Sequence, residues 1–131
     1  MSDLPNGKAL AKCYRVEQNN LYTLNQRIGA FRVKDKASIN VKFLYYILNR
    51  NRQLLRYDNG GDQTNLRKDD ILDITVPIPN LERQSEIVSI LDKFELMVND
   101  ISVGLPAEIE ARQKLYEYYR DKLLTFKEFV A

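Results

Sequence analysis

The sequence predicts an α+β fold, in which a small mixed domain with a few strands and a packed helix is followed by a long C-terminal helical arm. Three observations predict it. Residues 8–33 contain two stretches rich in small and β-tolerant residues, residues 41–56 place apolar side chains at helical spacing, and residues 81–126 continue that spacing over two long segments. We therefore expect two parts, residues 1–79 and residues 80–131.

Two strands are expected at the start of the first part. The segment KALAKCYRV of residues 8–16 is followed by a polar turn at residues 17–20, and residues 21–33 then return to an apolar pattern. The parity of the apolar positions changes within this second stretch. Gly29 is interpreted as a β-bulge that shifts the register.

A helix is expected over residues 41–56, where apolar residues recur every three or four positions. Ser38 and Asn40 are alternative N-caps, because either side chain can accept a hydrogen bond from the first helical turn. The apolar stripe of this helix should pack on the sheet. A polar loop centred on two glycines follows, and it ends in a short helical turn around residues 68–72.

A third, short strand is predicted at residues 74–78, where isoleucine and valine occupy alternate positions. Pro77 and Pro79 lack backbone donors and should end its ladder. Asn80 is a suitable N-cap for a long amphipathic helix over residues 81–103.

The arm contains a second helix. Gly104 is placed to end the first helix and Pro106 to begin the next, and the sequence leaves open whether this break is a kink or a sharp turn. Apolar residues spaced by seven give the last helix a coiled-coil-like seam, and other apolar residues widen it. Because such a surface is too apolar for an isolated helix, a partner is expected. The seam residues are Ile109, Tyr116, Tyr119, Leu123 and Phe126.

The composition is that of an ordinary soluble protein, with 44% hydrophobic and 29% charged residues among 131. No apolar run reaches the roughly 18 residues that span a bilayer, and the N-terminus lacks a signal-peptide segment, so a cytoplasmic protein is expected. Cys13 is the single cysteine and histidine is absent, which leaves neither a disulfide framework nor the usual zinc sites. Cys13 is interpreted as a small apolar strand residue, and no metal or cofactor is expected.

Charge is distributed unevenly along the chain. Residues 1–56 contain eleven Lys/Arg against three Asp/Glu, whereas residues 57–131 contain nine against fifteen. The basic half is therefore the candidate for contact with a polyanion. The sequence contains no glycine-rich nucleotide loop and no serine–histidine or cysteine–histidine arrangement, so we expect no enzyme and assign no catalytic residue.

Five segments occur in an order and at a spacing typical of one protein family: LNQRIGAFRV, FLYYILN, GGDQTNL, DILDITVPIPNLERQSEIVSILDKF and LPAEIEARQKLYEYYRDKLLTF. From Tyr22 onward the chain resembles the specificity subunits of type I DNA restriction-modification systems. The resemblance implies that residues 1–79 are the later portion of one target recognition domain and that residues 80–131 are a spacer and dimerisation arm. A complete family member has two recognition domains and two spacer helices, and further strands precede the portion matched here.

The resemblance also implies a role. The chain would be a non-catalytic DNA specificity or scaffolding component of a type I methyltransferase complex. Its partners would be double-stranded DNA, the methyltransferase subunit, and a second copy or a second specificity chain bound through the C-terminal helix. The alternative is a truncated protein-binding module that docks on the methyltransferase or self-associates without recognising DNA. A third alternative is a helical assembly protein that needs no methyltransferase.

Candidate DNA-binding residues form two groups. Cations in the basic half can contact phosphates, and polar residues behind the paired glycines can contact base edges or phosphates. The alternative is that these cations are solvated and that the amides stabilise a turn and a helix start. Asn25 and Gln26 are interpreted as partners of the local backbone. The candidates are Lys8, Lys12, Arg15, Arg27, Arg32, Lys34, Gln63, Asn65, Arg67 and Lys68.

Overall fold

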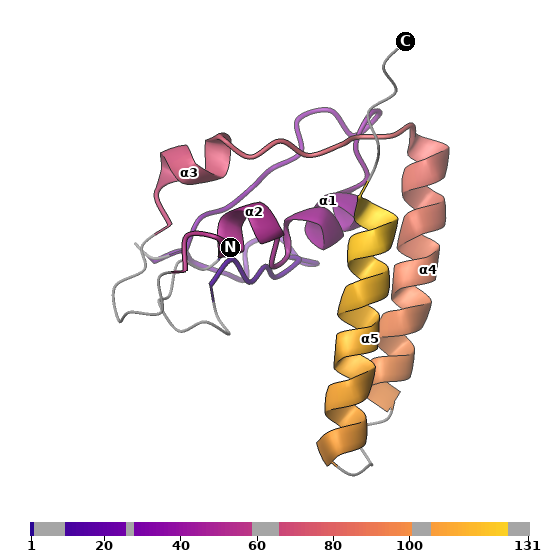
Figure 1. The fold of residues 1–131 in the computed structure, drawn as a ribbon. Helices are drawn as coiled ribbons and strands as arrows, with labels where there is room; N and C mark the ends of the chain where they lie inside the picture. The colour runs from indigo at the N-terminus through magenta and orange to yellow at the C-terminus, as the bar shows by residue number, and fades with distance from the viewer. Residues whose placement is uncertain (2–9, 26–27, 59–65, 101–105, 126–131) are drawn as a thin grey trace. The chain divides into compact units, whose positions relative to one another are not determined.

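The computed structural model describes residues 1, 10–25, 28–58, 66–100 and 106–125 (Figure 1). The backbone divides into two compact units, residues 1–76 and residues 77–131. The helices described in the first unit are α1 (Val41–Leu48), α2 (Arg52–Leu55) and α3 (Lys68–Leu72). Those described in the second unit are α4 (Leu81–Asp100) and α5 (Pro106–Leu124).

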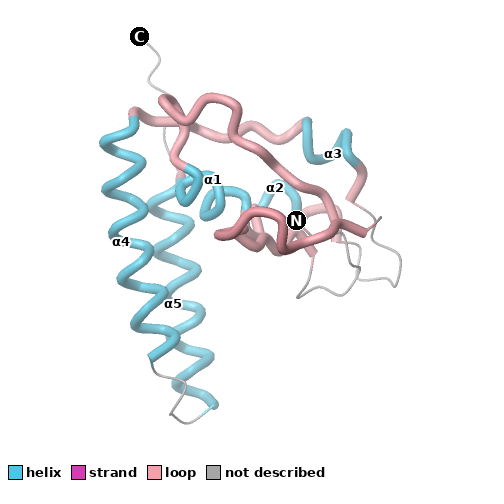
Figure 2. The backbone as a smooth tube through the Cα atoms, turned by 180° about the vertical axis from the view of Figure 1, so that it is seen from behind, coloured by secondary structure: helices cyan, strands magenta, loops and turns pink. Residues whose placement is uncertain are grey.

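The predicted α+β fold is wrong, because the described residues form helices and connecting loops without any strand (Figure 2). Side chains expected to pack in a sheet are exposed instead, including Val16 at 57% and Leu24 at 60%. Among the described residues, β-type pairing is limited to an isolated position at Ile28. Beside it, Gly29 N donates to Met1 O at 3.2 Å and the Met1 ammonium donates to Gly29 O at 2.9 Å. A strand is stable only when it has a neighbouring strand, and the described segments have none.

Side-chain groups take the place of strand partners in two of the expected strands. Cys13 N donates to Asn49 Oδ1 at 2.9 Å. The carboxamide of Gln53 makes both hydrogen bonds that a neighbouring strand would make with Thr75, since Thr75 N donates to Oε1 at 3.2 Å and Nε2 donates to Thr75 O at 2.7 Å. The extended backbone is thus satisfied without a ladder.

Asn40 is the N-cap of α1, as one of the two sequence alternatives predicted. Its Oδ1 accepts hydrogen bonds from Lys42 N at 2.8 Å and Phe43 N at 3.3 Å. Ser38 acts elsewhere, because its hydroxyl donates to Asp35 Oδ2. The cap satisfies two amides that have no partner within the helix.

The single helix predicted over residues 41–56 is broken into α1 and α2. At the break, Arg50 adopts a positive φ of 54°, a conformation that a non-glycine residue rarely adopts. Long-range hydrogen bonds hold it there, since Arg50 N donates to Ala11 O at 2.9 Å and Arg50 Nη1 donates to Leu10 O at 3.2 Å. Asn51 then caps α2, accepting a hydrogen bond from its first turn at 2.9 Å. Leu10 and Ala11, which are distant in sequence, therefore end the helix.

The first unit has a small core that joins its start to its later helices. Leu10 and Leu54 are completely buried, and their full burial stabilises the fold by about 2–3 kcal/mol each. The buried cluster is Leu10, Ala11, Leu54 and Leu66, with Met1, Leu55, Tyr57, Ile71 and Ile74 packed against it. The predicted helical turn at residues 68–72 is confirmed as α3.

The second unit begins at the predicted cap. Asn80 Oδ1 accepts a hydrogen bond from Arg83 N at 2.9 Å, which confirms Asn80 as the N-cap of α4. One turn later Gln84 is fully buried, and its Nε2 donates to Pro79 O at 2.7 Å. Ile87 and Leu91 follow on the buried face of the helix. The helical spacing in the sequence predicted the burial of Ile87 and Leu91, but it also placed Met97 on this face, and Met97 is 51% exposed.

α4 and α5 lie side by side in both views (Figures 1 and 2). The rings of Phe94 in α4 and Tyr119 in α5 are stacked, with centroids 5.6 Å apart and planes 15° apart. The chain therefore reverses direction between the two helices, which answers the question of a kink or a sharp turn. The predicted end of the first helix at residues 101–103 lies outside the described residues. Of the helices described, none combines the length and the apolarity needed to cross a membrane.

Candidate nucleic-acid interface

Residues 14–22 form a loop whose two ends are exposed tyrosines, Tyr14 and Tyr22. Tyr14 Oη and Tyr22 Oη are 3.0 Å apart, and the ring centroids are 5.6 Å apart at an interplanar angle of 61°. This edge-to-face geometry is favourable between aromatic rings. The hydrogen bond with Tyr22 raises the pKa of Tyr14 above its ordinary value. The tyrosine pair thus closes the loop.

Two basic candidates, Lys12 and Arg15, lie near the N-terminal end of this loop. Lys12 is exposed. Arg15 forms an ion pair with Glu17, and the two side chains are 33% and 62% exposed. The positive charge of Arg15 is therefore partly neutralised by its neighbour, whereas that of Lys12 faces solvent.

Arg32 and Lys34 are exposed on a second loop, which precedes α1. The carboxylate of Asp35 orders this loop, since Oδ1 accepts from Ala37 N at 2.9 Å and Oδ2 accepts from the Ser38 hydroxyl. These hydrogen bonds lower the pKa of Asp35, because they favour its charged form. The loop places two cations in solvent, with one fixed carboxylate beside them.

Arg67 and Lys68 are exposed at the start of α3. Arg67 is the residue before the helix, and its backbone N donates to Asp70 Oδ2 at 2.9 Å. Asp69 and Asp70 follow immediately, so two carboxylates oppose these two cations. Any phosphate contact here would be weakened by the adjacent negative charges.

Several predicted positions cannot be placed in the site. Lys8, Arg27, Gln63 and Asn65 lie outside the described residues, as does Gln26. Asn25 is described, and its backbone O accepts a hydrogen bond from Ile28 N at 3.2 Å. The described candidates therefore occur in three short stretches of sequence, which are Lys12 with Arg15, Arg32 with Lys34, and Arg67 with Lys68.

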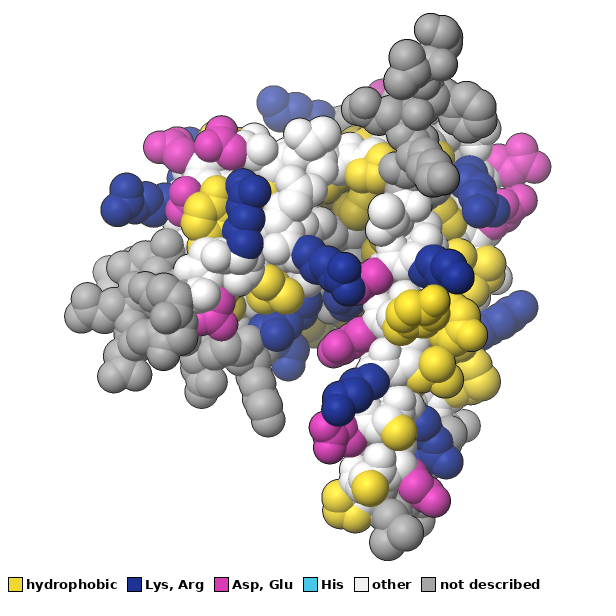
Figure 3. Space-filling view, in the orientation of Figure 1, with side chains coloured by type: hydrophobic (Ala, Val, Ile, Leu, Met, Phe, Trp, Pro, Cys, Tyr) yellow, Lys and Arg dark blue, Asp and Glu magenta, His cyan; other side chains and the backbone are white. Residues whose placement is uncertain are grey.

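The surface view agrees with this division. On the face shown in Figure 3, lysine and arginine side chains are interspersed with acidic and apolar ones and do not merge into one large basic patch. The first unit nevertheless carries a net positive charge, with thirteen Lys/Arg against eight Asp/Glu over residues 1–76. Its attraction for a polyanion is a property of the whole unit.

Part of the predicted assembly seam has a partner within the chain. Tyr119 lies on Phe94, while Ile109, Tyr116 and Leu123 are half-buried in the second unit. Phe126 lies outside the described residues. Large apolar side chains remain exposed on both helices, namely Leu96 at 67%, Met97 at 51%, Leu115 at 52% and Tyr118 at 56%.

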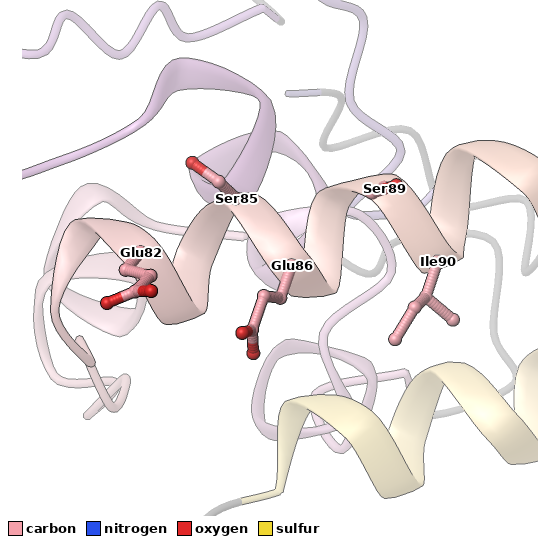
Figure 4. A pocket seen from close by; sticks show the side chains of 5 residues that line it. All are labelled: Glu82, Ser85, Glu86, Ser89 and Ile90. Atoms are coloured by element: carbon pink, nitrogen blue, oxygen red, sulfur yellow. The ribbon is translucent and has the colours of Figure 1, made fainter.

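A shallow, open depression lies along the first turns of α4 (Figure 4). Glu86 and Ile90 project to one side of the helix, whereas Ser85 points away from them. Its residues are Glu82, Ser85, Glu86, Ser89 and Ile90. The side chains do not converge on a point, as a catalytic or metal site requires, and no cluster of three potential metal ligands occurs among the described residues.

Cys13 is half-buried, and burial raises the pKa of its thiol to about 11. Its Sγ is 3.8 Å from Ala11 O, to which the thiol donates. The neutral thiol is a poor nucleophile at physiological pH, so the structure gives no support for a reactive role.

The tyrosine-closed loop was missed as a candidate site. The sequence predicts a polar turn at residues 17–20, and its polarity is the available signal: three consecutive amides, Gln18, Asn19 and Asn20, follow a strand-like segment that carries cations. What the sequence could not indicate was that Tyr14 and Tyr22 would meet across the turn. Their contact depends on the path of the backbone between them.

Comparison with known proteins identifies the family. The model of the type I restriction modification DNA specificity domain matches residues 13–111, which span parts of both units. The specificity subunit of the Escherichia coli type I restriction enzyme EcoR124I/EcoR124II is 42% identical over 107 residues, covering 79% of this chain and 26% of that protein. The specificity subunit of the type I restriction enzyme MpnII from Mycoplasma pneumoniae is 34% identical over 121 residues, covering 92% of this chain and 35% of that protein.

A putative type I restriction enzyme specificity subunit from Haemophilus influenzae is 51% identical over 67 residues, covering 51% of this chain and 17% of that protein. No solved structure matches the chain. The chain thus spans between 17% and 35% of the length of these three relatives. The match over residues 13–111 includes most of the chain. This chain therefore belongs to the family of the type I restriction modification DNA specificity domain.

Proposed function

We propose that this chain is a DNA specificity or scaffolding component of a type I restriction-modification methyltransferase complex, without catalysis of its own. The observation that carries the proposal is the family match, which runs from Cys13 in the basic first unit into α5 of the helical second unit. The relatives matched are named as specificity subunits of type I restriction enzymes. The proposal assigns DNA binding to the first unit and protein docking to the second.

The charge of the first unit supports a DNA role. Lys12, Arg32 and Lys34 are exposed, and the structure shows each on an extended or loop segment. Exposed cations of this kind neutralise phosphates and release condensed counterions, which gives affinity that depends on salt and not on sequence. Arg15 contributes less to this term because Glu17 offsets its charge.

The second unit supports the docking role. Over residues 77–131 it contains seven Lys/Arg against ten Asp/Glu, so DNA has little electrostatic attraction to it. Its two helices expose Leu96, Met97, Leu115 and Tyr118 to solvent. Such apolar side chains on a helical pair suit a protein partner. We assign them to contact with the methyltransferase subunit or with a second specificity chain.

The test of the DNA role is a titration with duplex DNA at two salt concentrations, with the chain alone and with its cognate methyltransferase subunit. The double variant Lys12→Ala, Lys34→Ala should flatten the slope of log K against log salt by about 1.8, because each phosphate contact contributes about 0.9. Lys93→Ala on α4 is the matched control and should leave the slope unchanged, since Lys93 is exposed in the acidic unit.

An unchanged slope in the double variant would remove these lysines from the interface. Absence of DNA binding both with and without the methyltransferase subunit would overturn the DNA role altogether. Sedimentation of the same samples would then show whether the chain still associates with itself or with the subunit.

A second candidate function is favoured by one observation. Acidic partners accompany the cations of two of the three stretches, with Glu17 beside Arg15 and Asp69 and Asp70 beside Lys68. This arrangement suits a protein-binding module that docks on the methyltransferase without contacting DNA. In that case the subunit should co-purify with the chain while the salt titration gives no binding.

A further inference from the structure

We infer that the tyrosine-closed loop, residues 14–22, recognises base edges in duplex DNA through the amides of Gln18, Asn19 and Asn20. This inference rests on the proposed function and names the element that would make the chain sequence-selective. The phosphate-binding cations described above cannot do so, because the backbone of DNA carries no sequence information directly.

The three amides are free to bind. Gln18, Asn19 and Asn20 are exposed at the turn of the loop, and in the described part of the chain their side chains make no hydrogen bond. A carboxamide presents a donor and an acceptor side by side. That pair matches N7 and N6 of adenine in the major groove, where Asn and Gln bind in a bidentate manner.

The N-terminal end of the loop is attached to a well-packed part of the first unit. Cys13 N is bonded to Asn49 at 2.9 Å, and just before it Ala11 O accepts from Arg50 N at 2.9 Å. Ala11 belongs to the buried core of the unit. The segment that leads to Tyr14 therefore starts at residues held by both packing and hydrogen bonds.

The tyrosine pair joins the C-terminal end of the loop to its N-terminal end. Tyr14 and Tyr22 are eight residues apart and joined through both their hydroxyls and their rings. Closing the loop in this way reduces the conformational freedom that binding would otherwise remove. At the turn, Asn20 has a φ of 63°, a left-handed conformation that asparagine tolerates better than most residues.

Charge at the loop is compatible with a polyanion. Glu17 is the carboxylate nearest in sequence to the amides, and its ion pair with Arg15 offsets its repulsion of phosphates. Lys12 is exposed at the base of the loop and can contact a phosphate while the amides reach the bases. The combination of a cationic base with an uncharged polar tip favours DNA over an apolar protein surface.

The test is selection from a pool of randomised duplex DNA, using the full chain alone and with its cognate methyltransferase subunit. The tip variant is Gln18→Ala, Asn19→Ala, Asn20→Gly, in which glycine keeps the left-handed backbone while removing the amide. We expect it to lose preference at the selected adenine positions by between about 5-fold and about 100-fold per lost contact, while binding to the pool at low salt is retained. Gln113→Ala, an exposed amide on α5, is the matched control and should select as the wild type does.

A second variant tests whether the tyrosine pair that closes the loop is needed, without removing any amide. Tyr14→Ala removes the contact that closes the loop but none of the three amide side chains. It should weaken selection, because the amides are then held less firmly. Melting of each variant by circular dichroism confirms that the chain is folded, and all four positions changed are exposed.

The outcomes separate this inference from the proposed function. If wild type and tip variant select the same sequence equally strongly, the loop does not recognise bases, although the DNA role stands. If the tip variant instead loses the methyltransferase subunit, the loop is a protein contact and the inference is wrong. Wild-type binding without any sequence preference also overturns the inference, and absence of wild-type DNA binding overturns both.

Discussion

The two units of this chain satisfy their backbones in different ways. In the second unit, α4 and α5 have 20 and 19 residues, and their hydrogen bonds are made within each helix. In the first unit, the three helices have 8, 4 and 5 residues, and much of the remaining backbone depends on single side chains such as Asn49 and Gln53. The first unit therefore concentrates its stability in a few contacts between distant residues, whereas the second distributes it along its helices.

The largest effect should follow from removing a core side chain of the first unit. Leu54→Ala leaves a cavity at a completely buried position and should lower the free energy of unfolding by about 2–5 kcal/mol. Leu72→Ala is the matched control, because Leu72 in α3 is 67% exposed and its loss should cost less than about 0.5 kcal/mol. Urea denaturation followed by circular dichroism measures both. Similar values for the two variants would show that the cluster around Leu54 is not the core of the unit.

The thiol of Cys13 provides a probe of the same region. Because burial raises its pKa from 9.0 to about 11, the thiolate population below pH 9 should be about 100-fold smaller than that of an unperturbed thiol. Alkylation should be slower by at least this factor in the native chain than in urea. The rate should also rise about tenfold per pH unit up to about pH 11, since only the thiolate reacts. A native rate equal to that of the unfolded chain would contradict the buried position.

The smallest expected effect comes from a single side-chain hydrogen bond, and it tests directly whether the backbone of the first unit depends on side chains as that of the second does not. Asn49→Ala removes the acceptor for Cys13 N and should lower the free energy of unfolding by about 1 kcal/mol. Asn99→Ala, at an exposed position within α4, should change it by less than about 0.5 kcal/mol. Thermal melts of the two variants give the difference. Equal effects would mean that the backbone of the first unit does not depend on this side chain.

The elements that the sequence predicted well are those with local causes. These elements depend on caps, spacing and prolines within a few residues. The N-cap Asn80, the helix α3 and the first residues of α4 and α5 were found where expected. The strands failed because apolar alternation states only that a segment could pair, whereas the partner must come from elsewhere in the chain. The break in the helix over residues 41–56 was likewise missed, because Ala11 accepts the hydrogen bond that holds Arg50 in its left-handed conformation.

The candidate site likewise has features with local causes, which the sequence predicted, and features that depend on the path of the backbone, which it did not. Cations such as Lys12 and Lys34 were identified from the sequence and are exposed, as a phosphate contact requires. The neutralisation of Arg15 by Glu17 was overlooked, although the two residues are only two positions apart, because side-chain direction on an irregular backbone has no fixed period. The pairing of Tyr14 with Tyr22 required the path of the loop, which no local pattern specified.

The carboxamide of Gln53 also marks a junction between modules. Through it Thr75 is tied to the first unit, while Pro79 is tied to the second through Gln84 Nε2. Residues 76–78 lie between these two anchors, and the division of the chain into units falls among them. A chimaera joined there would exchange a whole basic unit for another and leave the cap and helices of the second unit intact. The boundary between the two units therefore falls between two side-chain anchors, one belonging to each unit, so that one unit can be exchanged without altering the hydrogen bond that anchors the other.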